Sequence, residues 1–230
     1  MHPRVSGQGF LPRYGGGWMH QFGHVYALQQ ELLDTNTNDW FRAVELWHTA
    51  RQEGVAMNNQ HFSNILRQCV SPGAWEQSLQ VLKQMKRENI RPDVVGVGSI
   101  LASLVEGGQS DKVEELFNEY SGKMLLDSVC YLALIKAKVK SGDTKGALEV
   151  GKRQEDDRVP FLPYTYITLL DAAMDSNEPE YVLSLMSGLK NDNWQLNQNT
   201  LKKVEMFGKK HQLELELRRF LNTEDTKRIE

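Results

Sequence analysis

The sequence predicts an all-α protein, a solenoid of about six helical hairpins of roughly 35 residues each. Three observations support this fold. From about His24 onward, apolar residues recur with a period near 3.6, which is typical of amphipathic helices. Helix-breaking residues interrupt the pattern at regular intervals. The whole pattern then repeats at a nearly constant spacing along the chain.

Residues 1–23 form a glycine-rich extension before the repeats. The three glycines at 15–17 argue against a stable helix there. The first 30 residues contain no Asp or Glu, a composition that suits an organellar targeting segment. A flexible extension and an arm held by a partner remain open as alternatives. Tyr14 and Trp18 are the candidate anchors of such an arm, on a partner or stacked on a base.

The clearest hairpin spans residues 59–93. Its first helix contains FSNILRQC (62–69), with four apolar residues on one face. Its second helix contains WEQSLQVLKQM (75–85), again with four apolar residues on one face. Pro72 and Gly73 lie between the two segments and break the helix. Each hairpin leaves one apolar face bare, so neighbouring hairpins must stack to cover it.

The hairpin recurs when the sequence is shifted by about 35 residues. The apolar, often aromatic residue near the start of the first helix recurs at spacings of 35, 34, 35 and 35, at Phe62, Val97, Tyr131, Tyr166 and Leu201. We expect six units, of which the last is degenerate, followed by a short C-terminal tail. The units are 24–58, 59–93, 94–127, 128–162, 163–197 and 198–225, and the tail is 226–230. One position departs from the pattern, because Gly151 stands where other units place Leu82, Phe117 and Met186. Glycine lowers helix stability and leaves space, so we expect a loose or bent hairpin around 145–160.

Composition excludes several classes of function. The 230 residues carry a net charge of −3, which gives no overall positive field for nonspecific nucleic-acid binding, although local basic patches remain possible. No stretch approaches 18 consecutive apolar residues, so no membrane span is expected. Cys69 and Cys130 are far apart, and neither a disulfide framework nor a zinc site is indicated, which favours a reducing compartment.

At residues 59–93 the sequence resembles the pentatricopeptide repeat family. The aromatic Phe62, the break at Pro72-Gly73, the run SLQVLKQMKREN and the closing IRPD carry the resemblance. It covers roughly residues 24–221 and is looser outside 59–127. It implies a right-handed solenoid and RNA binding, with one base read per unit by the unit's fifth and last residues. The chain is similar to short, degenerate members associated with mitochondrial ribosomes and RNA-processing complexes of protists.

The base-reading positions are uneven when they are carried over to this sequence. Unit 59–93 offers Ser63 with Asp93, which resembles a purine-reading pair. Four of the other units combine a polar last residue with an apolar or missing fifth side chain, or lack both polar groups: Leu28 with Asn58, Gly98 with Asp127, Leu132 with Leu162, and Ile167 with Asn197. One complete pair is too few for a defined sequence, since each base adds only about 1–3 kcal/mol of discrimination.

Three basic clusters are candidates for RNA phosphate contacts, with ordinary solvated helix faces as the alternative. They consist of Lys136, Lys138 and Lys140; of Lys83, Lys86, Arg87 and Arg91; and of Lys202, Lys203, Lys209 and Lys210.

No catalytic, cofactor or metal site is expected. The six histidines are scattered, with no HxE, HExxH or CxxC motif. The acidic run 155–157 is expected in a solvated linker. The glycines 15–17 lack the Lys-Ser/Thr that follows a phosphate-binding loop.

Two functions from different classes follow from the resemblance. In the first, the protein is a non-catalytic component of an organellar ribonucleoprotein in the mitochondrial matrix, such as the mitochondrial ribosome. Its partners are then structured RNA, such as ribosomal RNA, and neighbouring proteins, with no membrane and no small-molecule substrate. In the second, it is a scaffold that binds only a partner peptide or helix in its concave face.

Overall fold

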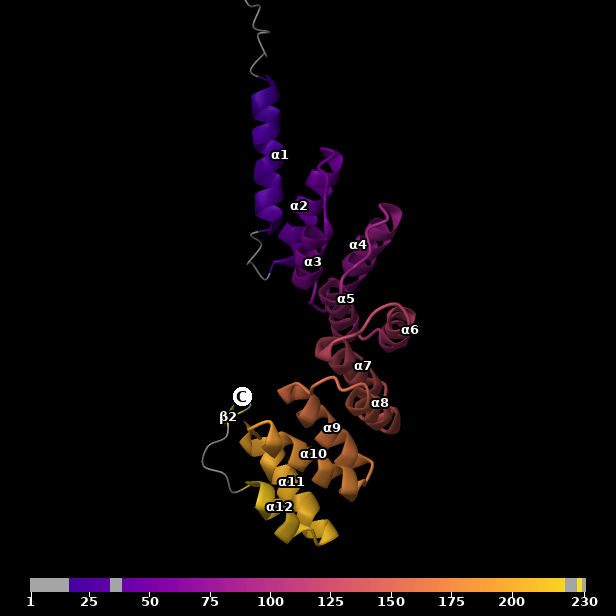
Figure 1. Ribbon diagram of the computed structural model, residues 1–230, viewed down its shortest axis with the longest axis vertical. Coiled ribbons are helices and arrows are strands. Elements are labelled where there is room, and N and C mark those ends of the chain that lie inside the picture. Colours follow the sequence, from indigo (N-terminus) through magenta and orange to yellow (C-terminus); the bar gives the residue numbers. More distant parts are fainter. Residues whose placement is uncertain (1–16, 34–38, 222–226, 229–230) are drawn as a thin grey trace, which may run out of the picture.

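The computed structural model describes residues 17–33, 39–221 and 227–228, and over these ranges the chain forms twelve helices arranged as successive hairpins (Figure 1). The first helices of the hairpins are α1 (Gly17–Leu33), α3 (Asn59–Gln68), α5 (Val94–Glu106), α7 (Ser128–Lys140), α9 (Pro163–Asp175) and α11 (Gln198–His211). The second helices are α2 (Trp40–Gln52), α4 (Trp75–Arg87), α6 (Ser110–Ser121), α8 (Thr144–Asp156), α10 (Pro179–Asn191) and α12 (Glu214–Leu221). The predicted all-α solenoid is confirmed.

The two ends of the array differ from the sequence expectation. Helices α3, α5, α7, α9 and α11 begin at the first residue of the units expected from the repeat spacing. In contrast, α1 begins at Gly17, inside the segment where glycines were expected to prevent a helix. Gly17 lies at the helix end, where its cost is smaller than in a helix interior. At the other end, β1 (Trp194–Gln195) pairs in parallel with β2 (Lys227–Arg228), a contact too short to be visible in the sequence.

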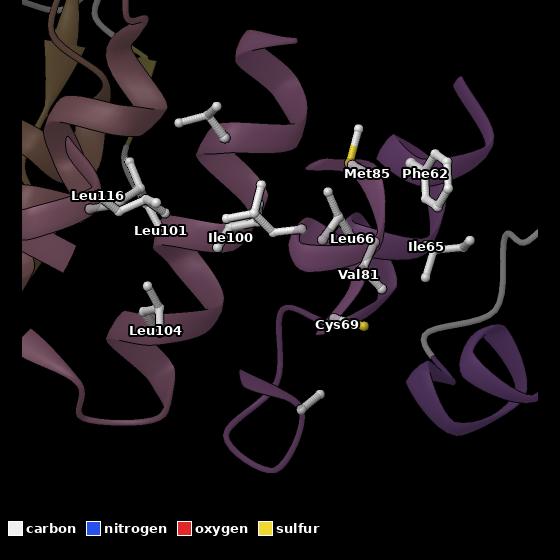
Figure 2. Packing of buried hydrophobic residues seen from close by; sticks show 14 of the residues in the cluster. Phe62, Ile65, Leu66, Cys69, Val81, Met85, Ile100, Leu101, Leu104 and Leu116 are labelled. Atoms are coloured by element: carbon white, nitrogen blue, oxygen red, sulfur yellow. The ribbon is translucent and has the colours of Figure 1, made fainter. Parts of the chain in front are cut away.

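The buried apolar side chains form two clusters, one from α1 to α7 and one from α7 to α12, and Val150 of α8 packs against both. Along the array α3 packs on α5, α5 on α7, α7 on α9 and α9 on α11. Second helices also contact the first helix of the following unit, as α4 contacts α5 and α8 contacts α9. Figure 2 shows the result between α3, α4 and α5, where apolar side chains of all three helices converge. Fully buried side chains of this kind stabilise the fold by about 1.5–3 kcal/mol each relative to exposure to water.

A hydrogen bond from a tyrosine hydroxyl to an aspartate carboxylate recurs in two consecutive units. The Tyr131 hydroxyl donates to Asp157, and the Tyr166 hydroxyl donates to Asp192 over 2.6 Å. Each bond ties the start of a first helix to the end of the second helix in the same unit. Burial, and next the bond to Asp157, raises the pKa of Tyr131 to about 12, so it donates as a neutral phenol. The acidic run 155–157 is exposed, as expected, but its first two residues belong to the end of α8 rather than to a linker, and its third accepts this bond.

The expectation of empty space at Gly151 is wrong. Helix α8 is continuous from Thr144 to Asp156, and Gly151 is buried within it. A Cβ atom at this position would lie 2.8 Å from Leu169 Cδ1 and 2.8 Å from the Tyr181 hydroxyl. Larger side chains of the next unit thus fill the volume that Leu82 or Phe117 occupies elsewhere. The sequence could not reveal this, because the compensating residues lie in other helices.

Candidate nucleic-acid interface

The last residues of four units are helix N-caps. The side chain of each accepts a hydrogen bond from a backbone N–H of the following first helix, as seen for Asn58, Asp93, Asp127 and Asn197. A side-chain oxygen at this position satisfies a donor that the helix itself leaves unpaired, worth typically about 1 kcal/mol. The polar residue at the base-reading position therefore has a structural task in this chain, whether or not it meets a base.

Asn58 carries the most complete cap. Its side-chain oxygen accepts from the His61 N–H at 3.2 Å, and the His61 Nδ1 accepts from the Asn58 N–H at 3.1 Å. This reciprocal arrangement is a capping box with His61 as the second member. His61 is buried, and burial lowers its pKa. The neutral imidazole, which can accept at Nδ1, is thus the form that the folded protein favours.

Ser63 and Asp93, the one complete base-reading pair, are hydrogen-bonded to each other. The Ser63 hydroxyl donates to Asp93 Oδ1 over 3.0 Å, and the Gly96 N–H donates to the same oxygen over 2.7 Å. Ser63 is only 7% exposed. The pair therefore lies side by side in a fixed geometry, and a base at this place must share donors and acceptors that the fold already uses.

The fifth positions of four other units carry no hydrogen-bonding side chain, whereas the fifth residue of unit 198–225 is the exposed Lys202. Leu28 and Gly98 are buried, and Leu132 and Ile167 are half-buried. At Gly98 an added Cβ would lie 3.3 Å from Val129 Cγ1, so a larger residue there would crowd the next unit. Base reading at these positions has no polar partner on the protein.

Exposed apolar side chains accompany these positions, and the sequence analysis did not single them out. The second residues of three successive units, Val95, Val129 and Tyr164, are 51%, 43% and 54% exposed. Lys136 places its Nζ 5.8 Å from the centre of the Tyr164 ring, within the range of a cation–π contact. The repeat spacing alone could have found these residues, since each follows a unit boundary at the same interval.

The lysine cluster of α7 is largely occupied by protein partners. Lys138 Nζ lies 2.8 Å from Glu114 and 3.2 Å from Asp143, and the bond to Glu114 is the main cause that raises the pKa of Lys138. Lys140 donates to the Val105 carbonyl over 2.8 Å. These contacts join α7 to its neighbours, so this cluster offers an RNA phosphate less charge than its sequence suggests.

In each of the other two basic clusters, some cations have protein partners and others have none. Lys203 pairs with Asp171 at 2.7 Å, and Lys210 reaches the side-chain oxygen of Asn177 at 3.5 Å. Lys86 pairs with Glu119 at 3.1 Å. The remaining members are exposed and make no hydrogen bond or ion pair with the described residues: Lys83, Arg87, Arg91, Lys202 and Lys209. Uncompensated cations thus gather at the end of α4 and along α11.

The candidate anchors of the N-terminal arm are not placed. Tyr14 lies outside the described residues, and of Trp18 only the helical backbone in α1 is described.

Within the described ranges, the side chains form no group of three His, Cys, Asp or Glu suited to a metal ion. No helix in those ranges has the length and apolarity to cross a membrane. Cys69 and Cys130 are buried free thiols, and burial raises the pKa of each to about 12. Both therefore stay protonated at neutral pH and are weak nucleophiles.

Helical hairpins stacked through their first helices, with polar caps at four unit boundaries, define a helical repeat protein of the pentatricopeptide class. The family model described as the pentacotripeptide-repeat region of PRORP matches residues 27–210. The chain belongs to this family. No curated protein sequence matches it.

Solved structures of the same class superpose on the chain. The PPR domain of Arabidopsis thaliana protein-only RNase P 1, in complex with tRNA, gives a TM-score of 0.70 at 19% identity, over 80% of this chain and 99% of that one. Nuclear protein-only RNase P 2 of A. thaliana gives 0.66 at 16% identity, over 82% of this chain and 42% of that one. The maize protein PPR10, in complex with an 18-nt psaJ RNA element, gives 0.56 at 17% identity, over 87% of this chain and 32% of that one. At these identities the likeness concerns the fold.

Proposed function

We propose that this protein binds structured RNA through its shape and through scattered phosphate contacts, with little reading of base sequence. The observation that carries the proposal is the contrast between fold and side chains. The array is of the pentatricopeptide class, yet only Ser63 and Asp93 place two hydrogen-bonding groups at the base-reading positions of a described unit. The tRNA complex of a structurally similar domain supports a structured RNA as the ligand.

The wider setting belongs to the same proposal. The protein acts without chemistry of its own, as a component of an organellar ribonucleoprotein in the mitochondrial matrix. That ribonucleoprotein is the mitochondrial ribosome or an RNA-processing complex. The acid-free first 30 residues fit import into an organelle, and the pairing of several lysines with carboxylates among the described residues fits a protein that is also held by protein neighbours.

The direct test is equilibrium binding of the full-length chain to fluorescent RNAs. We expect tRNA to bind with a salt-dependent affinity, and single strands of different sequence to differ from one another by less than about threefold, since phosphate contacts carry no sequence information. Ser63→Ala, compared with Ser184→Ala on the exposed face of α10, should change tRNA affinity by less than about twofold. A preference above about tenfold for one single-stranded sequence, lost in Ser63→Ala, would instead establish base reading.

A second candidate function is a protein-only scaffold, and exposed apolar side chains favour it. Val95 and Val129 are exposed on successive first helices. Farther along, a pocket of about 530 Å³ lies between α7, α9 and α11, lined by Val139, Met174 and Phe207 with Met206 72% exposed at its edge. A partner helix with apolar side chains fits such a surface.

Sedimentation of the tagged protein from mitochondrial lysate, with and without RNase, separates the two functions. Co-sedimentation with large particles that is lost after RNase treatment supports the role as a ribonucleoprotein component. A small complex indifferent to RNase, together with no tRNA binding by the purified protein, supports the scaffold.

A further inference from the structure

A pocket of about 590 Å³ lies at the boundary between units 59–93 and 94–127. It is formed by the end of α4 and the linker after it on one side, and by the end of α6 and the residues after it on the other. Its apolar lining includes Ile90, Pro92 and Met124. This is the opposite end of the hairpins from the turn at Pro72-Gly73, and Pro92 immediately precedes the cap residue Asp93.

The charged lining is strongly unbalanced. Three cations, Lys86, Arg91 and Lys123, face one carboxylate, Glu119. Lys123 Nζ lies 2.8 Å from Glu119 and Lys86 Nζ lies 3.1 Å from it, so a single carboxylate is shared by two ammonium groups. Hydrogen bonding from Lys123 is the main cause that lowers the pKa of Glu119, and it remains ionised at neutral pH. The four side chains therefore carry a net charge of +2 (three positive, one negative).

Unused donors remain on each cation. An ammonium group has three N–H donors and a guanidinium has five, and one carboxylate cannot satisfy them all. Arg91 is exposed and makes no hydrogen bond or ion pair with any described residue. Both lysines also lie over the Tyr120 ring, at 6.0 and 5.3 Å from its centre. Tyr120 itself is buried, so the ring fixes the lysines above an apolar floor on which a bound anion is less well solvated.

Similar ion pairs elsewhere in the chain lack this excess. Lys138 meets two carboxylates, Glu114 and Asp143, which more than balance its charge. The pocket between α7, α9 and α11 combines Lys203 and Lys210 with Asp171 and Asp175 and is neutral. The ends of α4 and α6 contribute negative helix dipoles near the pocket, and one lysine on each side offsets them. The positive charge of Arg91 is not used to offset a helix dipole.

We propose that this pocket binds a phosphate group, with Arg91 as the principal ligand, Lys86 and Lys123 as supporting donors and Glu119 as a competitor for both lysines. A guanidinium can donate two parallel hydrogen bonds to phosphate, while the two ammonium groups supply point charges. That the phosphate comes from an RNA backbone rests on the proposed function. A free phosphate compound would satisfy the same donors.

The pocket is tested first with inorganic phosphate, independently of RNA. Amide NMR spectra of the full-length chain are recorded with sodium phosphate and with sodium chloride at equal ionic strength. We expect saturable, phosphate-specific shifts at residues 89–91 and 122–124 that disappear in the double variant Arg91→Gln/Lys123→Gln. Shifts equal to those in chloride, or unchanged in the double variant, would show that the pocket does not bind phosphate. Poly-glutamate producing the same shifts at the same charge concentration would overturn its assignment to phosphate.

The source of the phosphate is tested with tRNA at 0.1 M salt. Each lost phosphate contact should reduce affinity about five- to tenfold and reduce the slope of log affinity against log salt by about one. We expect this for Arg91→Gln and tighter binding for Glu119→Gln, with the exposed Lys145→Gln on α8 as the matched control that changes neither.

The outcomes of the two experiments are separable. Phosphate-specific shifts with tRNA affinity equal in Arg91→Gln and Lys145→Gln would assign the pocket to a free phosphate compound and overturn RNA as its source. A wild-type chain that binds no tRNA would overturn the proposed function, and the phosphate titration would still decide the pocket.

Discussion

Two unit boundaries begin equivalent helices with opposite chemistry. At the boundary before α5, Asp93 caps the helix and also accepts from Ser63 of its own unit. At the boundary before α9, Leu162 makes no side-chain cap, and Pro163 occupies the first helical turn. Both α5 and α9 are 13 residues long and pack in the same way along the array. The fold requires a helix start at this point but not a polar side chain.

The difference shows that a polar residue at the last position of a unit is not required for the fold. Proline has no backbone N–H, and its φ is already close to the helical value. Pro163 therefore leaves one fewer unpaired N–H group at the start of α9, whereas in α5 Asp93 accepts from such a group. Once the cap is dispensable, the last position of the unit is free to become apolar. In this chain the surface accordingly changes from hydrogen-bonding groups at Ser63 and Asp93 to apolar side chains at Leu132, Leu162 and Ile167.

The largest expected effect comes from the buried aromatic side chain near the start of a unit's first helix. Phe62 and Tyr166 occupy matched core positions in their units and are almost fully buried. Phe62→Ala and Tyr166→Ala should each lower the free energy of unfolding by about 3–5 kcal/mol, measured by urea unfolding followed by circular dichroism. Tyr166→Phe, which removes only the hydrogen bond to Asp192, should cost about 1 kcal/mol. A much smaller cost for either alanine variant would mean that the two units are not equivalent in the core.

A smaller effect is expected where one unit departs from the pattern. Gly151→Leu restores the residue type that the repeat favours, but its side chain would collide with Leu169 and Tyr181. We expect a loss of about 1–3 kcal/mol in the free energy of unfolding. Gly122→Leu is the control, because nothing lies within 4 Å of a Cβ there. Stabilisation by Gly151→Leu would show that the position is underpacked after all.

The boundary comparison itself is sharpened by exchanging the two residues. Asp93→Leu removes the cap and leaves the buried Ser63 hydroxyl without its acceptor, and should cost about 1–2 kcal/mol in thermal or urea unfolding. Leu162→Asp should change stability by less than about 0.5 kcal/mol, because a new cap is offset by lost apolar contact of a half-buried leucine. Equal losses in both variants would contradict the claim that capping is dispensable before Pro163.

The smallest effect concerns pH at the boundary before α3. The folded-state pKa of His61 lies below its ordinary value of 6.5, so the neutral form is favoured by folding. Its contribution to stability is complete above pH 6.5 and is lost as the pH falls through the folded pKa. We expect the unfolding midpoint in urea to fall over this range in the wild type and less in His61→Asn.

His48→Asn, on the exposed side of α2, is the control for the pH series and should follow the wild type. Carboxylates with lowered pKa values, Glu119 and Asp143, lose their contributions only below their ordinary values of 4.5 and 3.8. Burial raises the pKa of Glu155, but this carboxyl is present in both proteins, so the difference between wild type and His61→Asn isolates the histidine. An identical slope in His61→Asn and wild type would exclude a role for the capping box.

Local sequence patterns were sufficient for the helices and the period of the array. An apolar face, a break and a cap are each encoded within one unit, and four consecutive spacings fixed the register of α3 to α11. Failures occurred where the partner lies in another helix. Gly151 is filled by Leu169 and Tyr181, Asp157 accepts from Tyr131, and β2 pairs with β1 across more than 30 residues of chain.

The sequence by itself determined the class of fold, the residues at which α3, α5, α7, α9 and α11 begin, and the scarcity of polar pairs at the fifth and last positions of the units, because these depend on residue type and spacing alone. Only the tertiary structure decided which cations are neutralised and which are available. Lys138, Lys203 and Lys86 meet carboxylates 24 to 33 residues away, whereas Arg91 meets none among the described residues. Stacking brings charges of neighbouring units together, so the electrostatic surface belongs to the array and not to any single repeat.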